Sequence, residues 1–140
     1  MKPVLLDTGC IVALLDASER YHQACAAAIA GLAAPLVTCE AVVAESCHLL
    51  GRSRGAAAAV LENIEQGVFL VPFRLVDRVK PVRKLLAKYA DVRMDLADAC
   101  LVDLATQVGS GDILTLDRDF QVYRWDKKRP FRMLIELDME

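Results

Sequence analysis

Short apolar runs alternate with longer segments of helical periodicity along this chain of 140 residues. The apolar runs predict five strands, at residues 1–8, 36–38, 68–71, 112–117 and 131–136. Between them, apolar positions recur every three or four residues, which predicts helices at residues 11–15, 21–32, 41–50, 56–64, 79–89 and 96–105. Strands that alternate with helices favour a mostly parallel sheet covered on both faces. We therefore expect a three-layer α/β/α domain with about five strands, the last at a sheet edge.

The length of the chain indicates a single domain over residues 1–140. A second domain would leave each half near the size at which hydrophobic cores fail, and no repeat or low-complexity linker divides the chain. Hydrophobic residues make up 55% of it, yet the uncharged stretch at residues 24–39 contains Gly31 and Pro35 and is too short and Ala-rich to cross a bilayer. We expect no membrane span. The apolar surplus predicts instead a face covered by a second copy, as in a homodimer.

The N-terminus lacks a basic region followed by an apolar segment and a cleavage site, so we expect a cytoplasmic protein. The cysteines are odd in number and lie in apolar surroundings, which favours reduced core thiols over disulfides. They are Cys10, Cys25, Cys39, Cys47 and Cys100. With no C-x-x-C pair and only two histidines, His22 and His48, the spacing argues against a zinc site.

The net charge of −2 gives no sign of nucleic-acid binding, but the basic residues are unevenly distributed. Many follow the predicted strand 112–117: Arg118, Arg124, Lys127, Lys128, Arg129 and Arg132. Two more, Arg52 and Arg54, flank a predicted helix break. Such a cluster is either a solvated rim or a surface that contacts phosphates or a partner. As candidate substrate contacts we take Arg118, Arg124, Lys127 and Lys128.

Two aspartates, Asp7 and Asp117, end predicted strands. In an open parallel sheet, ligands bind beyond the carboxyl ends of the strands, where both side chains would lie. The string Asp7-Thr8-Gly9 also occurs in aspartic proteases, but those enzymes need an all-β fold. Asp7 has two further interpretations: a phosphoacceptor nucleophile, although Gly9 stands where such phosphatases carry a second aspartate, or a helix N-cap.

A predicted helix carries two glutamates, Glu40 and Glu45. Glu45 lies among apolar residues, where an acid is costly unless it is paired or bound to metal. Five residues at about 100° each place Glu40 about 140° around the helix from Glu45, so only one can face a site. We choose Glu45, because Glu40 in the first turn suits the helix dipole.

The helix at residues 96–105 brings three more aspartates. Asp95 fits a helix N-cap, whereas Asp98 lies one turn inside among small residues and is the better ligand. Asp103, about 140° away from Asp98, is expected to face solvent. Near Asp117, Thr115 points to the same side of the sheet, and Asp119 is either a ligand or a turn former. Asp112 is discounted because it starts its strand at the opposite edge of the sheet.

The four chosen acids, Asp7, Glu45, Asp98 and Asp117, could not all ionise close together without a compensating cation. Ligation by oxygen alone, with waters completing the shell, suits Mg²⁺ or Mn²⁺. Such a cation activates water and stabilises charge on a phosphate. The acids therefore predict metal-dependent hydrolysis of phosphodiesters.

Four segments, in this order along the chain, together resemble the PIN-domain nucleases, and most nearly the VapC-type toxins. They are Leu5-Leu6-Asp7-Thr8, Thr38 followed by Glu45, Asp95-Leu96-Ala97-Asp98-Ala99, and Thr115-Leu116-Asp117-Arg118-Asp119-Phe120. The resemblance implies a PIN-like fold and a Mg²⁺- or Mn²⁺-dependent endoribonuclease. It also implies a homodimer and a partner antitoxin whose tail occupies the acidic groove. By position it assigns the metal and the chemistry to Asp7, Glu45, Asp98 and Asp117, with Thr8, Thr115, Asp95 and Asp119 in support.

Three functions remain open on the sequence alone. The leading hypothesis is an endoribonuclease acting as the toxin of a toxin–antitoxin pair. The second is a PIN module that binds nucleic acid or a partner without turnover. In that case RNA would remain uncut when it is incubated with the protein and Mn²⁺. The third is a phosphatase or receiver with Asp7 as nucleophile, for which a phosphate analogue would form an adduct at that residue.

Overall fold

The computed structural model describes residues 2–138, so Met1 of the first predicted strand lies outside the described residues. Five short strands form one sheet in the order β3-β2-β1-β4-β7, and every neighbouring pair is parallel. The strands are β1 (Val4–Leu6), β2 (Leu36–Val37), β3 (Phe69–Leu70), β4 (Asp112–Leu114) and β7 (Arg132–Met133). The predicted α/β class, parallel sheet and edge position of the last strand are confirmed.

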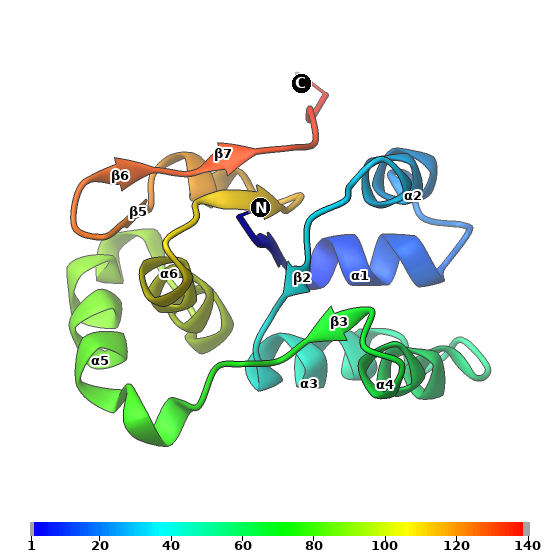
Figure 1. Cartoon of the computed structure of the whole chain (residues 1–140), viewed down its shortest axis with the longest axis horizontal. Helices are drawn as coiled ribbons and strands as arrows, with labels where there is room; N and C mark the ends of the chain where they lie inside the picture. The colour runs from blue at the N-terminus through cyan, green and yellow to red at the C-terminus, as the bar shows by residue number, and fades with distance from the viewer. Residues whose placement is uncertain (1, 139–140) are drawn as a thin grey trace.

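Within the described residues, six helices connect the strands and cover the sheet (Figure 1). They are α1 (Thr8–Leu15), α2 (His22–Ala30), α3 (Glu40–Leu49), α4 (Ala56–Glu65), α5 (Val79–Lys88) and α6 (Leu96–Val108). Figure 1 shows α1 to α4 on one side of the sheet and α5 and α6 on the other. Right-handed crossovers require this arrangement, because the chain steps outward from β1 to β3 and then returns past β1 to β4.

The reversal of strand order falls between β1 and β4, which pair directly through Leu5 with Ile113 and Leu6 with Leu114. The pairing continues one residue further, since the Asp7 amide donates to the Leu114 carbonyl at 3.0 Å. The carboxyl ends of both strands therefore open side by side at the topological switch point, where open α/β sheets bind ligands.

The strands are shorter than the apolar runs because polar residues leave the ladder early. Asp7 caps α1, its carboxylate accepting from the Thr8 amide at 2.8 Å, so β1 ends at Leu6. The last predicted strand contributes only Arg132 and Met133. Between β4 and β7 the chain forms a separate antiparallel hairpin, β5 (Arg124–Trp125) and β6 (Arg129–Pro130), which the sequence did not predict.

One glycine, Gly111 just before β4, is required because this hairpin approaches it closely. A Cβ added to Gly111 would lie 2.0 Å from Nε1 of Trp125, so only glycine leaves room for the indole. The indole in turn donates to the Pro130 carbonyl at 3.1 Å, which holds the hairpin closed. Three short 3₁₀ turns, η1 (Leu75–Asp77), η2 (Ala90–Val92) and η3 (Arg118–Gln121), complete the chain.

The core lies between the sheet and its two helix layers. Leu5, Leu6, Ile113 and Leu114 of the two central strands are fully buried, and each such side chain contributes roughly 1.5–3 kcal/mol to folding. All five cysteines are free, as predicted, and four of them are buried. Within residues 2–138, no helix is both long enough and apolar enough to span a bilayer.

The prediction that Asp103 faces solvent was wrong. Its side chain is only 4% exposed and accepts hydrogen bonds from the Arg78 guanidinium at 2.8 and 3.0 Å. The helical angle placed Asp103 correctly on the side of α6 away from Asp98. However, α5 packs against that side and brings Arg78 from its N-terminal end.

Candidate active site

Five acids line one cavity of about 560 Å³ at the carboxyl ends of β1 and β4. They are Asp7, Glu45, Asp95, Asp98 and Asp117. Thr8, Gly9, Leu49, Leu116 and Arg118 complete the wall. The structure therefore brings together all four acids chosen from the sequence: Asp7 just after β1, Glu45 in α3, Asp98 in α6, and Asp117 in the segment that follows β4. We call this space the acidic cavity.

Asp7 is the most enclosed of these acids, at 6% exposure. One carboxylate oxygen accepts from the Thr8 amide, and the other accepts from the Thr115 hydroxyl at 2.6 Å. Burial raises the pKa of Asp7 to about 6, helped by the charges of Asp117 and Glu45 and opposed by the two hydrogen bonds. The acid is thus held in one orientation but is costly to ionise.

The β1 and β4 ends are fixed by two buried threonines. Thr115 donates to Asp7 and accepts from the Asp117 amide at 3.0 Å, so one hydroxyl orders both aspartates. Thr38, at the end of β2, donates to the Leu6 carbonyl at 2.7 Å and holds the strand end just before Asp7. Such charge-assisted and buried hydrogen bonds restrict the carboxylates to one geometry.

Asp98 lies in the first turn of α6, where Asp95 is the N-cap and accepts from the Asp98 amide at 2.8 Å. The carboxylate of Asp98 accepts from the Tyr123 hydroxyl at 3.0 Å. Burial raises the pKa of Asp98 to about 7, and the charges of Asp95, Asp7 and Asp117 add to this. Asp95 therefore serves as a cap, as expected, and its carboxylate also borders the acidic cavity.

Asp117 and Asp119 occupy different places. Asp117 is the N-cap of η3, accepts from the Asp119 amide at 2.9 Å, and lines the cavity. Burial also raises the pKa of Asp117, as do the charges of Asp119, Asp95 and Glu45. Asp119 is half-buried within the 3₁₀ turn and does not line the cavity. The geometry thus favours the turn-forming interpretation of Asp119 over direct ligation.

The two glutamates of α3 point to different spaces, as the helical angle predicted. Glu45 is half-buried in the wall of the acidic cavity. Glu40 is exposed in the first turn and borders a separate hollow with Phe73 and Leu96. Only Glu45 is therefore placed to act with the other acids.

The basic residues predicted to form one cluster are divided between different surfaces. Arg118 lies at the acidic cavity, where its guanidinium donates to the Asp138 carbonyl. Arg124 and Lys127 line a second hollow beside α5. Arg132 pairs with Asp112 at 2.9 Å, Arg129 approaches Asp126 at 3.6 Å, and Lys128 is exposed in the hairpin turn.

The donors of the acidic cavity suit a hard divalent cation, because all of them are oxygens. Thr8 adds a buried hydroxyl at the wall of the cavity, and no residue among 2–138 gives it a hydrogen-bond partner. In residues 2–138, no group of three or more His, Cys, Asp or Glu side chains is already placed to hold a metal ion. Mg²⁺ commonly keeps several waters and uses one or two carboxylates, so the donor set fits a hydrated cation.

Tyr123 is the functional neighbour that the sequence did not reveal. It is fully buried, its ring packs edge-on against Tyr89 and Phe120, and its hydroxyl reaches Asp98. Burial, and after it the neighbouring charge of Asp98, raise the pKa of Tyr123, so its hydroxyl remains a donor. The only sequence signal was an aromatic residue between Phe120 and Trp125, a pattern that core residues share.

Comparison with known proteins agrees with this geometry. A family model described as the PIN domain matches residues 4–126. Ribonuclease VapC26 of Mycobacterium tuberculosis (strain ATCC 25618 / H37Rv) is 33% identical over 117 residues, which cover 82% of this chain and 87% of that protein. The crystal structure of Mycobacterium tuberculosis VapC20, a sarcin-ricin loop cleaving toxin, has the same fold. It matches with a TM-score of 0.79 and 22% identity over 91% of this chain and 99% of that one.

The sheet order, the switch-point cavity and these matches lead to one family. The matched region, residues 4–126, contains all five acids of the cavity. The chain therefore belongs to the PIN-domain family and is a relative of the VapC-type ribonucleases.

Proposed function

We propose that the protein is a Mg²⁺- or Mn²⁺-dependent endoribonuclease that hydrolyses RNA phosphodiester bonds, and that it is the toxin of a toxin–antitoxin pair. One observation carries the proposal: four acids from four separate segments line one cavity at the switch point of a parallel sheet. The ribonuclease named among the relatives supports the choice of RNA as substrate.

In this proposal Asp7, Glu45, Asp98 and Asp117 hold the cation, and Thr8 offers its free hydroxyl beside them. A bound divalent cation would lower the pKa of a water and stabilise the negative charge that builds on the phosphate. The protein fixes the acids: Thr115 orients Asp7 and Tyr123 orients Asp98. Arg118 borders the cavity and is the candidate contact for a neighbouring phosphate.

The raised pKa values of Asp7 and Asp98 have a consequence for metal binding. With pKa values of about 6 and about 7, both acids are partly protonated below neutral pH. A cation must displace these protons, so its affinity rises as pH increases from about 6 to 8. Activity should rise over the same range.

Two kinds of partner follow from the proposal. A second copy of the chain forms a homodimer, for which the standard expectation is at least about 1,200 Å² of total buried area. An antitoxin encoded beside the gene silences the enzyme in the cytoplasm. Sedimentation at tens of micromolar tests the dimer, and co-purification with the product of the neighbouring open reading frame tests the antitoxin.

The activity is tested with purified protein and a structured RNA. Cleavage should appear with Mn²⁺, stop on addition of chelator, and return when Mn²⁺ is restored. RNA that is bound but never cut would indicate a binding module instead. A phosphate-analogue adduct on Asp7 would indicate a nucleophile, although both of its carboxylate oxygens are engaged by Thr8 and Thr115.

A further inference from the structure

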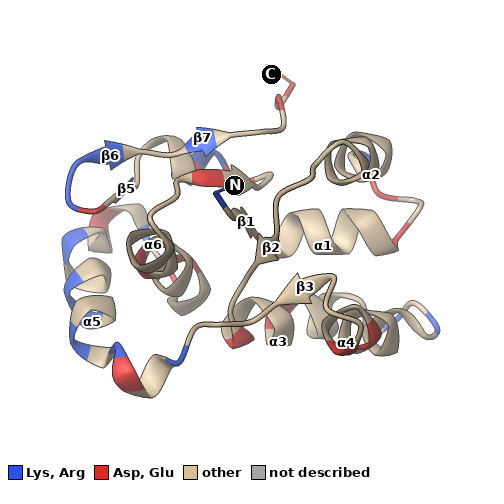
Figure 2. Cartoon of the chain, in the orientation of Figure 1, with Lys and Arg blue, Asp and Glu red and all other residues tan. Residues whose placement is uncertain are grey.

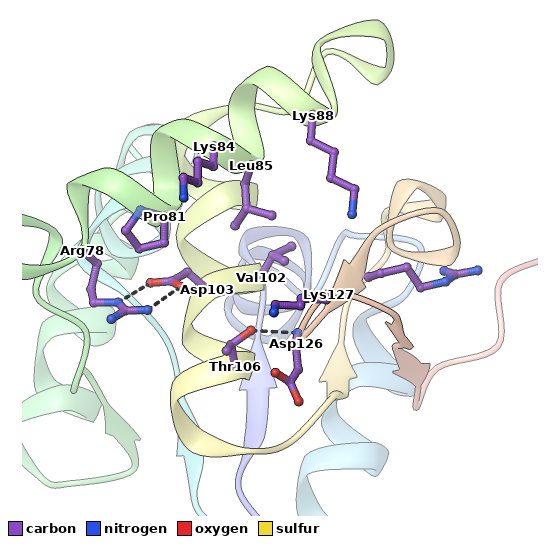
Figure 3. Close-up of a pocket in the computed structure, with 11 residues that line it drawn as sticks. Arg78, Pro81, Lys84, Leu85, Lys88, Val102, Asp103, Thr106, Asp126 and Lys127 are labelled. Atoms are coloured by element: carbon purple, nitrogen blue, oxygen red, sulfur yellow. Dashed lines mark hydrogen bonds and ion pairs between the residues drawn. The ribbon is translucent and has the colours of Figure 1, made fainter.

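A second hollow of about 320 Å³ lies between α5, α6 and the β5–β6 hairpin (Figure 3). Its wall is rich in cations: Arg78, Lys84, Lys88, Arg124 and Lys127. Two acids among the described residues, Asp103 and Asp126, accompany them. Figure 3 shows Lys84 and Lys88 extending from α5 and Lys127 reaching across from the hairpin toward the same space. We call this space the basic hollow.

Most of its positive charge is not neutralised. Arg78 is paired with Asp103, and Asp126 is approached by Arg129. Within residues 2–138, by contrast, the ammonium groups of Lys84 and Lys127 have no carboxylate within ion-pair distance, and that of Lys88 lies over the Tyr89 ring at 5.3 Å.

Arg124 adds a further cation to the basic hollow. Its guanidinium donates to the carbonyls of Gln121, Val122 and Tyr123, which fixes the side chain without cancelling its charge. Arg124 therefore keeps its charge in one fixed orientation at the edge of the hollow.

The basic hollow and the acidic cavity are neighbours on α6. Asp98 lines the acidic cavity, while Val102 and Thr106, one and two turns further along the helix, line the basic hollow. At 1.5 Å per residue, these positions lie about 6 and 12 Å from Asp98 along the helix axis. The start of the hairpin also links the two spaces. The Tyr123 hydroxyl donates a hydrogen bond to Asp98, and the next residue, Arg124, borders the basic hollow.

The acidic cavity and the basic hollow would interact differently with a polyanionic substrate. An acidic cavity repels phosphates until a cation is bound, so it contributes little attraction of its own. Phosphate contacts by Lys and Arg supply most of the affinity for nucleic acid. The molecule carries such side chains on one side, along α5 and the β5–β6 turn, as the blue segments in Figure 2 show.

We propose that the basic hollow binds backbone phosphates of the substrate RNA outside the cleaved bond, through Lys84, Lys88, Arg124 and Lys127. The distances of about 6 and 12 Å along α6 correspond to about two to four stacked nucleotides at roughly 3.4 Å each. The inference rests on the proposed function and adds a binding site to it. The site holds the flanking strand, and the acidic cavity receives the scissile phosphate.

The test measures RNA binding with chelator present, so that no RNA is cut and the acidic cavity adds no attraction. The probe is a labelled single-stranded RNA of about 20 nucleotides, and its affinity is measured by fluorescence anisotropy from about 0.05 to 0.3 M KCl. The variant is Lys84→Ala/Lys88→Ala, which truncates two exposed side chains. The matched control is Arg52→Ala/Arg54→Ala, which removes two exposed charges from the turn between α3 and α4, at the opposite end of Figure 2.

Two lost contacts to a single strand should reduce the slope of log affinity against log salt by about 1.4. The same slope predicts a loss of affinity on the order of 25-fold at 0.1 M salt. The control should keep the wild-type slope, and Lys84→Arg/Lys88→Arg should restore binding because both charges return.

Equal losses in the two alanine variants would mean that only net charge matters and would overturn the proposal. The proposal would also be overturned if the wild-type protein did not bind RNA. The same holds if Lys84→Ala/Lys88→Ala bound RNA as tightly as wild type. If that variant loses binding to polyglutamate but not to RNA, the hollow belongs to an acidic protein partner and the proposal also fails. A protein that binds RNA through these lysines but never cuts it would contradict the proposed function and leave this inference standing.

Discussion

Replacing Asp7 by Asn should stabilise the metal-free protein at alkaline pH and destabilise it at acidic pH. The pKa of Asp7 is raised by burial from 3.8 to about 6, so the folded state favours the protonated acid. A raised carboxyl pKa costs stability above about pH 6, where the folded protein must ionise the group, and costs nothing below about pH 4. Asn never ionises and escapes this cost.

The size of the effect follows from the same values. The difference between 3.8 and about 6 corresponds to about 3 kcal/mol at pH 8, at about 1.4 kcal/mol per pKa unit. Against this, Asn accepts from the Thr8 amide but disturbs the bond with the Thr115 hydroxyl, a loss of about 1 kcal/mol. The variant should therefore be more stable than wild type by about 2 kcal/mol at pH 8, and less stable by about 1 kcal/mol at pH 4.

Thermal and urea unfolding in chelator, at pH 4, 6 and 8, measure this difference. At pH 8 the variant should melt roughly 6 °C higher than wild type. Mn²⁺ at ten times its dissociation constant should then stabilise wild type by about 1.4 kcal/mol and the variant by much less. The matched control is Asp112→Asn at the start of β4, where the carboxylate pairs with Arg132 and lies away from the acidic cavity. A difference between Asp7→Asn and wild type that does not change sign with pH would refute the reasoning.

Three further changes test other parts of the account. Tyr123→Phe removes the hydroxyl that donates to Asp98, so we expect a loss of about 1–3 kcal/mol in stability. The pKa of Asp98 should also rise, which would shift the acidic limb of the pH–rate profile to higher pH. Glu45→Gln should reduce RNA cleavage at least about 100-fold, whereas Glu40→Gln on the same helix should retain it; equal activities would remove Glu45 from the site. Gly111→Ala should destabilise by about 1–3 kcal/mol in urea unfolding because its Cβ would collide with the Trp125 indole, and an unchanged midpoint would show that the indole moves freely.

Much of the acidic cavity could be predicted because its residues lie at positions that regular structure determines. Asp7 and Asp117 follow apolar runs, and the ends of adjacent parallel strands must meet. Glu45 was separated from Glu40 by the angle between residues on a helix. These inferences needed only the repeat of a strand or a helix.

The sequence was less informative wherever irregular backbone or a packing partner decided the outcome. The helical angle showed that Asp103 lies on a different side of α6 from Asp98. It could not show that Arg78, at the start of α5, pairs with Asp103 on that side. Tyr123 and Arg124 lie beyond a 3₁₀ turn, at the start of a hairpin that no periodicity announced. For the same reason, the sequence could not show that Arg124 and Lys127 border the hollow beside α5 and not the acidic cavity. Their position depends on how the hairpin folds over α6.

We have proposed that the acidic cavity performs metal-dependent RNA hydrolysis. Two single substitutions, one in β4 and one in the loop that follows it, give the sharpest test of this activity. Asp117→Asn and Asp112→Asn each remove one carboxylate, the first inside the acidic cavity and the second at the other end of the strand. The measurement is the initial rate of cleavage of one structured RNA in Mn²⁺, with both variants shown to be folded. We expect a loss of at least about 100-fold for Asp117→Asn and a rate near wild type for Asp112→Asn. Equal rates for the two variants, or cleavage by wild type that persists in chelator, would contradict it.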